Sequence, residues 1–423
     1  MKMAQAERKT ILENGVRILT KEMPHVRSVS MGIWVNAGAR DETPPESGLC
    51  HLIEHMLFKG TLKRTAFQIA KEFDAIGGQS NAFTSMENTC CHARVMDSHL
   101  NTMVDILCDI FLNSCFHEDE YEKERPVILQ EIGMVEDNPD DFIHVLLGQA
   151  FWGGQSLGQS VLGTRENLLR FDVSAVKDFF HKFNQPDRIV IAASGNLVHD
   201  RIVDLIAPAF ETISRGGALP ERNSSFESGK AVFYMKEIEQ AHIAIGVKGL
   251  SMTDPARYAL NILNTILGGN MSSRLFQEIR EQRGLAYSVY SFLASYADSG
   301  MFGAYAAVEP GQVPETVGLI ANEMRRLKEM PVDQTTVQDA KEYAKGNLML
   351  ASESVDNQMA RLAQNEFNLG RFVSLEEIME EIDKVTAMDV QCLAEALFQS
   401  TPSALAILGP VTESAAVQDA FAL

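Results

Sequence analysis

The same order of predicted strands and helices occurs twice along the chain, and this repetition restricts the fold more than any other feature. In each half two strand-like runs precede a pair of helices, and two more strands and several long amphipathic helices follow. The segment 56–60 lines up with 265–269, an offset of 209 residues (265 minus 56). Tandem duplication of one α+β unit explains this with the fewest assumptions. We therefore expect an α+β protein with two homologous tandem domains, each an antiparallel-type sheet covered by helices.

The joint between the two copies is expected where the composition changes. Segment 214–229 reads SRGGALPERNSSFESG and has the Gly, Pro and Ser content of a linker. The predicted domains are therefore 1–213 and 230–423. A length of 423 residues agrees with this division, because single cores seldom grow beyond about 250–300 residues.

The overall charge and hydropathy exclude several classes of partner. The formal net charge of −20 argues against nucleic acid, since phosphate binding needs a positive field. If some of this charge lines a closed cavity, it favours basic peptides. The sequence has no apolar run near the ~20 residues that cross a bilayer, and its N-terminus lacks the apolar stretch of a signal peptide. We therefore expect no membrane partner and a cytoplasmic location, with six cysteines that are reduced and mostly buried.

Three residues near the start of the chain form a candidate metal motif. His51, Glu54 and His55 lie in a segment of helical periodicity. At about 100° per residue, Glu54 falls at about 300° and His55 at about 40° from His51, so the three share one helix face. This is the inverted H-x-x-E-H arrangement, in which two imidazoles grip an ion and the carboxylate reaches a water on it. Chance gives such a triplet in roughly two chains per hundred, so the motif needs independent support.

The duplication supplies part of that support. At the offset of 209, the three motif positions of the second copy hold Leu260, Leu263 and Asn264. The fold can therefore be built without the triplet. Whatever the motif does is confined to the first domain.

A catalytic zinc needs a third protein ligand and an open position for water. The helical segment 118–135 offers Glu124 and Glu131, which are seven residues apart and hence on one stripe of a helix. We predict Glu131 as the third ligand and Glu124 as a carboxylate that does not bind the metal itself but orients one of its ligands. Pro126 complicates the geometry, because proline inside a helix removes a hydrogen bond and tends to kink it.

These residue types point to peptide hydrolysis. Two imidazoles and a carboxylate suit zinc, and zinc lowers the pKa of a bound water toward ~7. Glu54 then takes the proton as the oxygen attacks an amide carbonyl and delivers it to the leaving amine. The sequence thus predicts a zinc-dependent endopeptidase with one Zn²⁺ per chain.

The same residues resemble the pitrilysin/insulinase class of inverted zinc peptidases, in particular its mitochondrial processing peptidase-like branch with bacterial homologues. That class has a ligand glutamate far downstream, in a block like VILQEIGMVEDNPDD, and a second glutamate seven residues earlier that matches Glu124. Here the separation from His55 to Glu131 is 76 residues (131 minus 55). The resemblance runs from about Asn14 to Thr401.

A second match lies in the other half, at GGNMSSRLFQEIREQRGLAYSVYS (268–291). The resemblance implies that Arg280 and Tyr287 contact the substrate near the scissile carbonyl, where both side chains can donate to a developing oxyanion. Without the resemblance, Arg280 reads as a helix surface charge and Tyr287 as the start of a strand.

The segment GGQSNAFTS (77–85) looks like the family's substrate-docking edge strand. An exposed edge takes an extended peptide by strand addition, although a purely structural edge is the alternative. The predicted substrate-binding residues are Asn81, Ala82, Phe83 and Thr84.

The resemblance also implies an assembly. The two domains would form half of a closable peptidase chamber, and chains of this length in the class usually pair. A homodimer is therefore expected, with the second domain of one subunit facing the zinc of the other. One alternative is a catalytically silent scaffold or partner subunit resembling the core proteins of respiratory complexes. Another is a catalytic subunit that needs a different partner chain.

Overall fold

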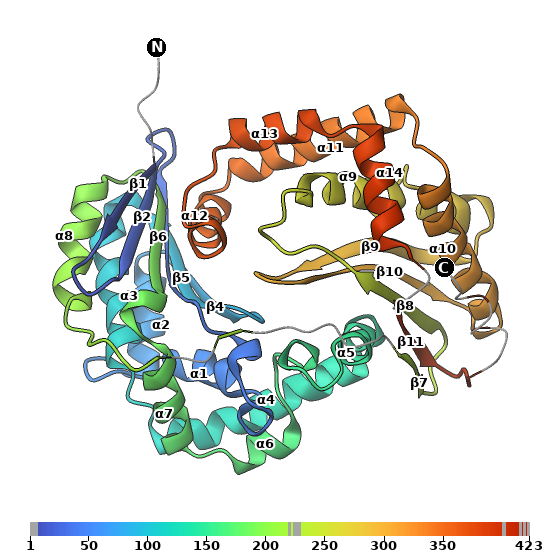
Figure 1. The fold of residues 1–423 in the computed structure, drawn as a ribbon. Helices are drawn as coiled ribbons and strands as arrows, with labels where there is room; N and C mark the ends of the chain where they lie inside the picture. Colours follow the sequence, from blue (N-terminus) through green and yellow to red (C-terminus); the bar gives the residue numbers. More distant parts are fainter. Residues whose placement is uncertain are drawn as a thin grey trace. The chain divides into compact units, whose positions relative to one another are not determined.

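The computed structural model of the protein describes residues 7–218, 221–222, 230–399, 403–413, 417 and 420. Within these residues the chain forms two compact units, each built on one sheet with helices against it (Figure 1). Unit 1 combines Met1–Gly133, Gln159–Arg222 and Leu350–Phe372, and unit 2 combines Met134–Gly158, Asn223–Met349 and Val373–Leu423.

The sheet of unit 1 has the strand order β1-β2-β6-β3-β5-β4. The β2–β6 pair is parallel and the other pairs are antiparallel. Strand β4 therefore lies at one edge. The strands are β1 (Glu7–Ile11), β2 (Arg17–Glu22), β3 (Ser28–Val35), β4 (Gln79–Thr84), β5 (Thr89–Met96) and β6 (Ile189–Gly195).

The sheet of unit 2 repeats this topology in the order β7-β11-β8-β10-β9. Its β7–β11 pair is parallel and the rest are antiparallel, as for β2, β6, β3, β5 and β4 of unit 1. The predicted duplication of an α+β unit is thus confirmed, with one parallel pair in each sheet. The strands are β7 (Ala231–Met235), β8 (Ala241–Lys248), β9 (Ala286–Ser295), β10 (Gly300–Val308) and β11 (Ser403–Gly409).

One face of the first sheet carries the main core of unit 1. Inward side chains of β3 such as Met31 and Ile33 pack there against helices, because alternate residues of a strand point to opposite faces. Apart from one helix late in the sequence, the α-helices of the described residues in unit 1 are α1 (Leu49–Leu57), α2 (Ala66–Ala75), α3 (Leu100–Asn113), α6 (Arg165–Arg170), α7 (Val173–Phe183) and α8 (His199–Phe210), with most of α4 (Glu118–Asp137).

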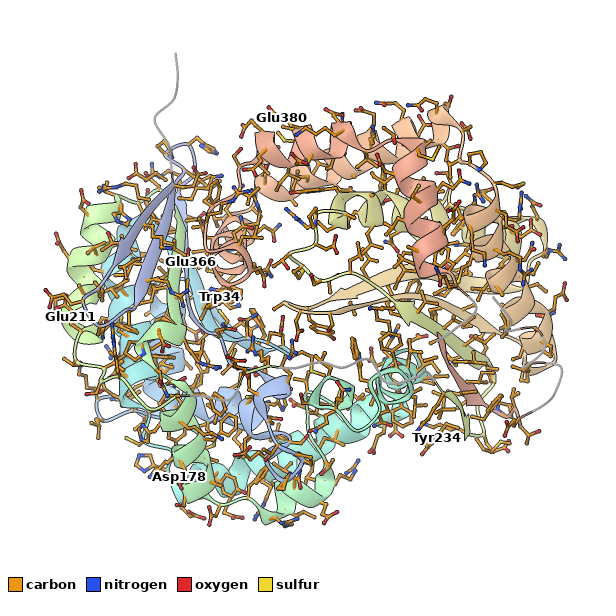
Figure 2. The ribbon with its side chains drawn as sticks, viewed as in Figure 1. Trp34, Asp178, Glu211, Tyr234, Glu366 and Glu380 are labelled. Carbon is orange, nitrogen blue, oxygen red and sulfur yellow. The ribbon has the colours of Figure 1, made fainter. Side chains whose placement is uncertain are left out.

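The opposite face of the first sheet is covered by α12 (Val355–Leu369), a helix from late in the sequence. Trp34 of β3 packs there against Met359 and Leu362. Figure 2 labels Trp34 and Glu366, which lie on β3 and α12. Glu366 pairs with Lys9 of β1 at 2.6 Å. Both faces of β3 are therefore buried.

Unit 2 is completed in the same way by α5 (Pro139–Trp152), a helix from the first half of the chain that packs on β8 and β11. The other face of that sheet packs against α9, α10 and α14. The remaining helices of the described residues in unit 2 are α9 (Arg257–Gly268), α10 (Val313–Glu329), α11 (Gln334–Ser352), α13 (Leu375–Lys384), α14 (Ala387–Leu397) and the π-helical turn Phe276–Gln282.

The compact units differ from the predicted domains 1–213 and 230–423 in two segments. Helix α5 falls within the predicted domain 1–213 and α12 within 230–423, yet each belongs to the other unit. An apolar helix face shows that a helix is half-buried, but it does not show which sheet covers it. Of the predicted linker, 219–220 and 223–229 lie outside the described residues, and Arg222 is bonded to Asp41 of unit 1 at 2.6 Å.

Among the described residues, no helix combines the length and apolar character needed to cross a membrane. All six cysteines are free, and four of them are buried, as the sequence predicts.

Candidate metal centre

The helix that carries the motif begins at a glycine that no other residue replaces easily. Gly48, the N-cap of α1, has a φ of +105°, and a Cβ there would lie 3.0 Å from the carbonyl oxygen of Leu162. Because glycine has no capping side chain, Glu42 caps the helix instead. Its carboxyl group accepts hydrogen bonds from the backbone N–H of Gly48 at 2.8 Å and of Cys50 at 2.6 Å, and the residue is only 3% exposed.

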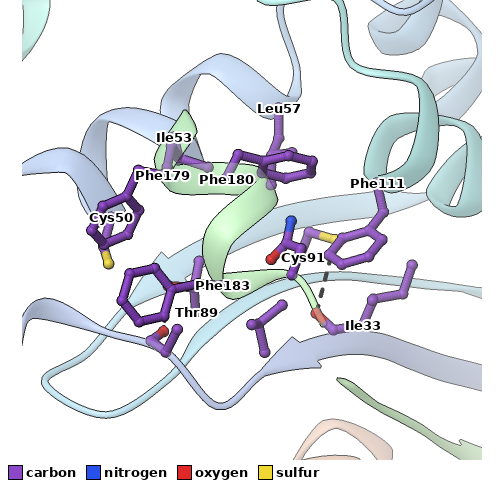
Figure 3. A pocket seen from close by; sticks show the side chains of 13 residues that line it. Ile33, Cys50, Ile53, Leu57, Thr89, Cys91, Phe111, Phe179, Phe180 and Phe183 are labelled. Atoms are coloured by element: carbon purple, nitrogen blue, oxygen red, sulfur yellow. Dashed lines mark hydrogen bonds between the residues drawn. The ribbon is translucent and has the colours of Figure 1, made fainter. Parts of the chain in front are cut away.

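The back of α1 is apolar and faces the first sheet and α7. Cys50, Ile53 and Leu57 line a cavity of about 30 Å³ together with residues such as Cys91 and Phe183 (Figure 3). Their i, i+3, i+7 spacing makes one buried stripe. Since that stripe lies against the sheet and α7, the motif residues occupy the rest of the helix surface.

The second element of the site is α4, which supplies Glu124 and Glu131. The helix continues from Glu118 to Asp137 with Pro126 inside it, so the proline does not end it. The seven-residue spacing puts Glu124 and Glu131 on one stripe of α4, and both carboxylates lie close to the imidazole of His55.

The geometry brings His51, His55 and Glu131 together. Glu131 Oε2 lies 3.2 Å from His55 Nε2 and 3.6 Å from His51 Nε2. One ligand atom from each residue lies within 4.8 Å of the other two. In a tetrahedral zinc site with bond lengths of ~2.0–2.1 Å, ligand atoms are separated by about 3.3 Å. The donor set and its spacing therefore fit a zinc ion.

His55 is oriented by both of its ring nitrogens. Its Nδ1 lies 3.1 Å from Glu124 Oε2, and its Nε2 faces Glu131. A proton on Nδ1 is shared with the carboxylate and leaves the Nε2 lone pair free for a metal. The other oxygen of Glu124 pairs with Lys59. Burial raises the pKa of Glu124, but the hydrogen bonds from Lys59 and His55 outweigh it and hold that pKa below its usual value.

His51 is the more buried of the two imidazoles. Burial, together with the neighbouring His55, lowers the pKa of His51 to about 4. The ring is therefore neutral near neutral pH, which is the form that binds a metal. Its Nδ1 is buried and has no hydrogen-bond partner in the described part of the chain.

Glu54 lies beside this group and is held by the neighbouring strand. The hydroxyl of Thr84, the last residue of β4, donates to Glu54 Oε2 at 2.6 Å. Burial raises the pKa of Glu54, against the opposing effects of Thr84 and His55. A carboxyl group poised in this way can hold and release a proton. The sequence predicted Thr84 as a docking residue, whereas the structure gives its hydroxyl a contact with Glu54.

The other predicted docking residues lie along β4, which among the described residues pairs only with β5. Asn81 is exposed and Ala82 is half-buried. The ring of Phe83 lies edge-on to Trp34 of β3 with 5.2 Å between centroids, so this side chain packs on one face of the sheet to which both strands belong. Strand β4 is thus an edge strand, and the backbone N–H of Ala82 donates a hydrogen bond to the side-chain oxygen of Asn81 at 2.9 Å.

Arg280 and Tyr287 belong to unit 2 and lie together there. The Arg280 guanidinium is 4.6 Å from the ring centroids of both Phe276 and Tyr287, a cation–π arrangement. Tyr287 is 81% exposed at the start of the edge strand β9. Arg280 lies in a π-helical turn, a distortion that often occurs at functional sites.

In the described residues of the second copy, the metal group has no counterpart. Leu260 and Leu263 of α9 are buried in the core of unit 2, and Asn264 accepts a hydrogen bond from Ser291 at 2.7 Å. Within the described residues, His51, His55 and Glu131 form the one group of three metal-ligating side chains.

Besides the hydrogen bond between Thr84 and Glu54, two further contacts of the site were not predicted. Lys59 lies four residues after His55, so helical spacing alone could have suggested that it reaches the same helix face. Nothing in the sequence pointed to Glu42 as the cap of α1, because six residues, the last of them Gly48, separate it from the first residue of the helix.

Comparison with known proteins agrees with this arrangement. Residues 17–165 match the family model of the insulinase peptidases, family M16, and residues 170–343 match a model described as the peptidase M16 inactive domain. The second description agrees with a second copy that lacks the metal group.

Similar proteins cover almost the whole chain. An uncharacterized zinc protease of Bacillus subtilis is 42% identical over 398 residues, 94% of this chain and 97% of that protein. An uncharacterized zinc protease of Streptomyces coelicolor is 38% identical over 420 residues, 97% of this chain and 91% of that protein. The chain therefore belongs to the insulinase family of peptidases, M16, as the resemblance predicted.

Solved structures share the fold. A protease from Helicobacter pylori superposes with a TM-score of 0.89 over 96% of this chain and 100% of that chain, at 19% identity. A structure described as a peptidase M16 inactive domain from Pseudomonas fluorescens gives the same TM-score and identity over 96% and 99%. Family membership supports a peptidase function.

Proposed function

We propose that the protein is a zinc-dependent endopeptidase in which His51, His55 and Glu131 hold one zinc ion and Glu54 is the general base. One observation carries this proposal: Glu131 Oε2 lies 3.2 and 3.6 Å from the two imidazole Nε2 atoms. These distances suit tetrahedral ligation. The relatives named as zinc proteases agree with the choice of metal.

The chain's own residues account for the proton transfers. Zinc, when bound, supplies a Lewis acid that polarises the scissile carbonyl and makes water more nucleophilic. Glu54 takes the proton of the attacking water and passes it to the leaving amine. Thr84 fixes the carboxylate while it does so, through its 2.6 Å hydrogen bond. Glu124 holds the Nδ1–H of His55 and so fixes the ring.

The substrate is proposed to be an extended or unfolded peptide. Its backbone would add to the free edge of β4, where Asn81, Ala82 and Phe83 give affinity with little side-chain selectivity. Arg280 and Tyr287 would donate hydrogen bonds near the scissile carbonyl. We further propose that two copies of the chain pair and enclose the peptide in a chamber, and that the net charge of −20 favours basic segments.

Metal analysis combined with peptide digestion tests this function. The purified protein is expected to contain one zinc per chain and to cleave an unfolded polypeptide at internal bonds. Glu54→Gln should keep the zinc and lose turnover, whereas His51→Ala should lose both. A wild-type protein that binds zinc but leaves all peptides intact would instead support a silent scaffold. Size-exclusion chromatography of the single chain tests the homodimer.

A further inference from the structure

Lys59 is linked to the proposed metal site through Glu124. In the described part of the chain, its side chain forms no hydrogen bond or ion pair with the three proposed ligands. Lys59 follows the end of α1, and its backbone N–H donates to the carbonyl of Met56 at 3.2 Å. Its ammonium pairs with Glu124 Oε1, and the other oxygen of that carboxylate lies 3.1 Å from His55 Nδ1. The three side chains therefore form one chain of polar contacts, from Lys59 through Glu124 to His55.

Glu124, at the centre of this chain of polar contacts, is well shielded from solvent. The side chain of Glu124 is 10% exposed and that of Lys59 is 29% exposed. A carboxylate with one oxygen fixed by an ammonium has little freedom to rotate, so its second oxygen stays aimed at the imidazole. A half-buried ion pair holds its geometry better than a surface pair, which water and salt weaken.

The second copy of the unit shows that this lysine is not needed for the fold. At the offset of 209, the position of Lys59 corresponds to Gly268. A Cβ at Gly268 would lie 2.3 Å from the backbone nitrogen of Ser291, so no side chain fits there. Lys59 is thus absent from the copy that also lacks the metal group.

We propose that Lys59 is a positioning residue, which acts through Glu124 to fix the ring of His55 for metal binding. The inference rests on the proposed function, because it concerns the same site. Two roles of Lys59 make opposite predictions. A lysine that acts only through its charge repels a divalent cation, so its removal tightens zinc binding. A lysine that positions Glu124 favours zinc binding, so its removal weakens it.

The experiment measures the zinc affinity of the full chain by competition with a fluorescent chelator near neutral pH. Lys59→Met is expected to weaken zinc binding about threefold to tenfold. This loss is smaller than the 10–100-fold typical of a direct partner of a ligand, because Lys59 acts one contact further away. Lys59→Arg should stay within about twofold of the wild type, since a guanidinium can make the same pair. Lys63→Met is the matched control, because it removes an equal charge from an exposed position four residues on.

A double-mutant cycle shows whether the effect passes through Glu124. In a Glu124→Ala background, Lys59→Met should cause no further loss of affinity. The ¹⁵N shifts of His55 in the zinc-free protein give a readout that a general loss of stability does not move. The wild type should hold the proton on Nδ1, and Lys59→Met should show a mixture of tautomers. Lys59→Gln repeats each measurement if the methionine variant does not fold by circular dichroism.

The outcomes separate this inference from the proposed function. If the wild type binds no zinc, the proposed function fails. If the wild type binds zinc and His55→Ala abolishes binding, the site stands. In that case, an unchanged or tighter affinity of Lys59→Met, or an equal loss with and without Glu124, overturns the role of Lys59 alone.

Discussion

Removing the side chain of Glu42, which caps α1, should destabilise unit 1 while the proposed metal ligands stay unchanged. Glu42 is 3% exposed and accepts hydrogen bonds from the backbone N–H of Gly48 and Cys50. A buried N–H without a partner costs about 1–3 kcal/mol. Glu42→Ala, which leaves both without an acceptor, should therefore lower the free energy of unfolding by about 2–5 kcal/mol. Glu42→Gln keeps one acceptor oxygen and should lower it by about 1–2 kcal/mol.

The assay can isolate unit 1. The chain has two tryptophans, Trp34 in unit 1 and Trp152 in unit 2. In a Trp152→Phe background, fluorescence during urea unfolding reports on unit 1 alone. The measurement is made with a chelator, because bound metal would add its own stabilisation. Glu46→Gln, a half-buried carboxylate in the same loop, is the control and should change stability by less than about 1 kcal/mol. A loss below about 0.5 kcal/mol for Glu42→Ala would refute the capping role.

The pH dependence of the same variants has a defined sign. Burial raises the pKa of Glu42 to about 8, from an ordinary value of 4.5. Between these values the folded state binds more protons than the unfolded state, so the stability from this group falls as pH rises. It is fully present below pH 4.5 and lost above about pH 8. Glu42→Gln does not titrate. Its deficit relative to the wild type should therefore shrink between about pH 5 and about pH 9, and a constant deficit would contradict the raised pKa.

Three further predictions concern the site and its supports. Chelation with EDTA should abolish peptide cleavage, and added zinc should restore it; activity that persists in metal-free protein would contradict the zinc mechanism. Gly48→Ala should lower the free energy of unfolding by about 1–3 kcal/mol, measured by urea unfolding, since its φ of +105° and its contact with Leu162 both exclude a Cβ. Arg280→Lys should lower kcat of peptide cleavage about tenfold or more while zinc content stays at the wild-type level, because lysine cannot reproduce the planar donor geometry.

The parts of the site that the sequence predicted are those set by local periodicity. The i, i+3, i+4 spacing of His51, Glu54 and His55 defines a helix face whatever surrounds it. The seven-residue spacing of Glu124 and Glu131 does the same for α4. The approach of the two helices to one imidazole belongs to the tertiary structure. The resemblance to a family implied it, whereas periodicity alone did not.

Other features had a signal that the sequence analysis did not use. Helix α5 was not predicted, although Asn138 caps it and Pro139 occupies its first turn, a pattern typical of a helix start. Helix α13 likewise follows a capping Ser374. The assignment of α5 to unit 2 and of α12 to unit 1 had no local signal, since the apolar residues of a helix do not show which sheet covers them.

The contacts of single side chains across elements were also beyond the sequence. Lys59 was aligned with Gly268 as part of the repeat, but its pairing with Glu124 depends on where α4 crosses the end of α1. The hydrogen bond from Thr84 to Glu54 depends in the same way on the register of β4. Both contacts bear on the chemistry of the site more than on the fold.

Anomalous X-ray diffraction at the zinc absorption edge, on crystals of protein purified with zinc, tests the central claim most directly. The account predicts one strong peak per chain, within about 2.0–2.2 Å of an Nε2 of His51, an Nε2 of His55 and a carboxylate oxygen of Glu131. A zinc-loaded crystal without a peak between these three side chains, or with its peak on other residues, would contradict it.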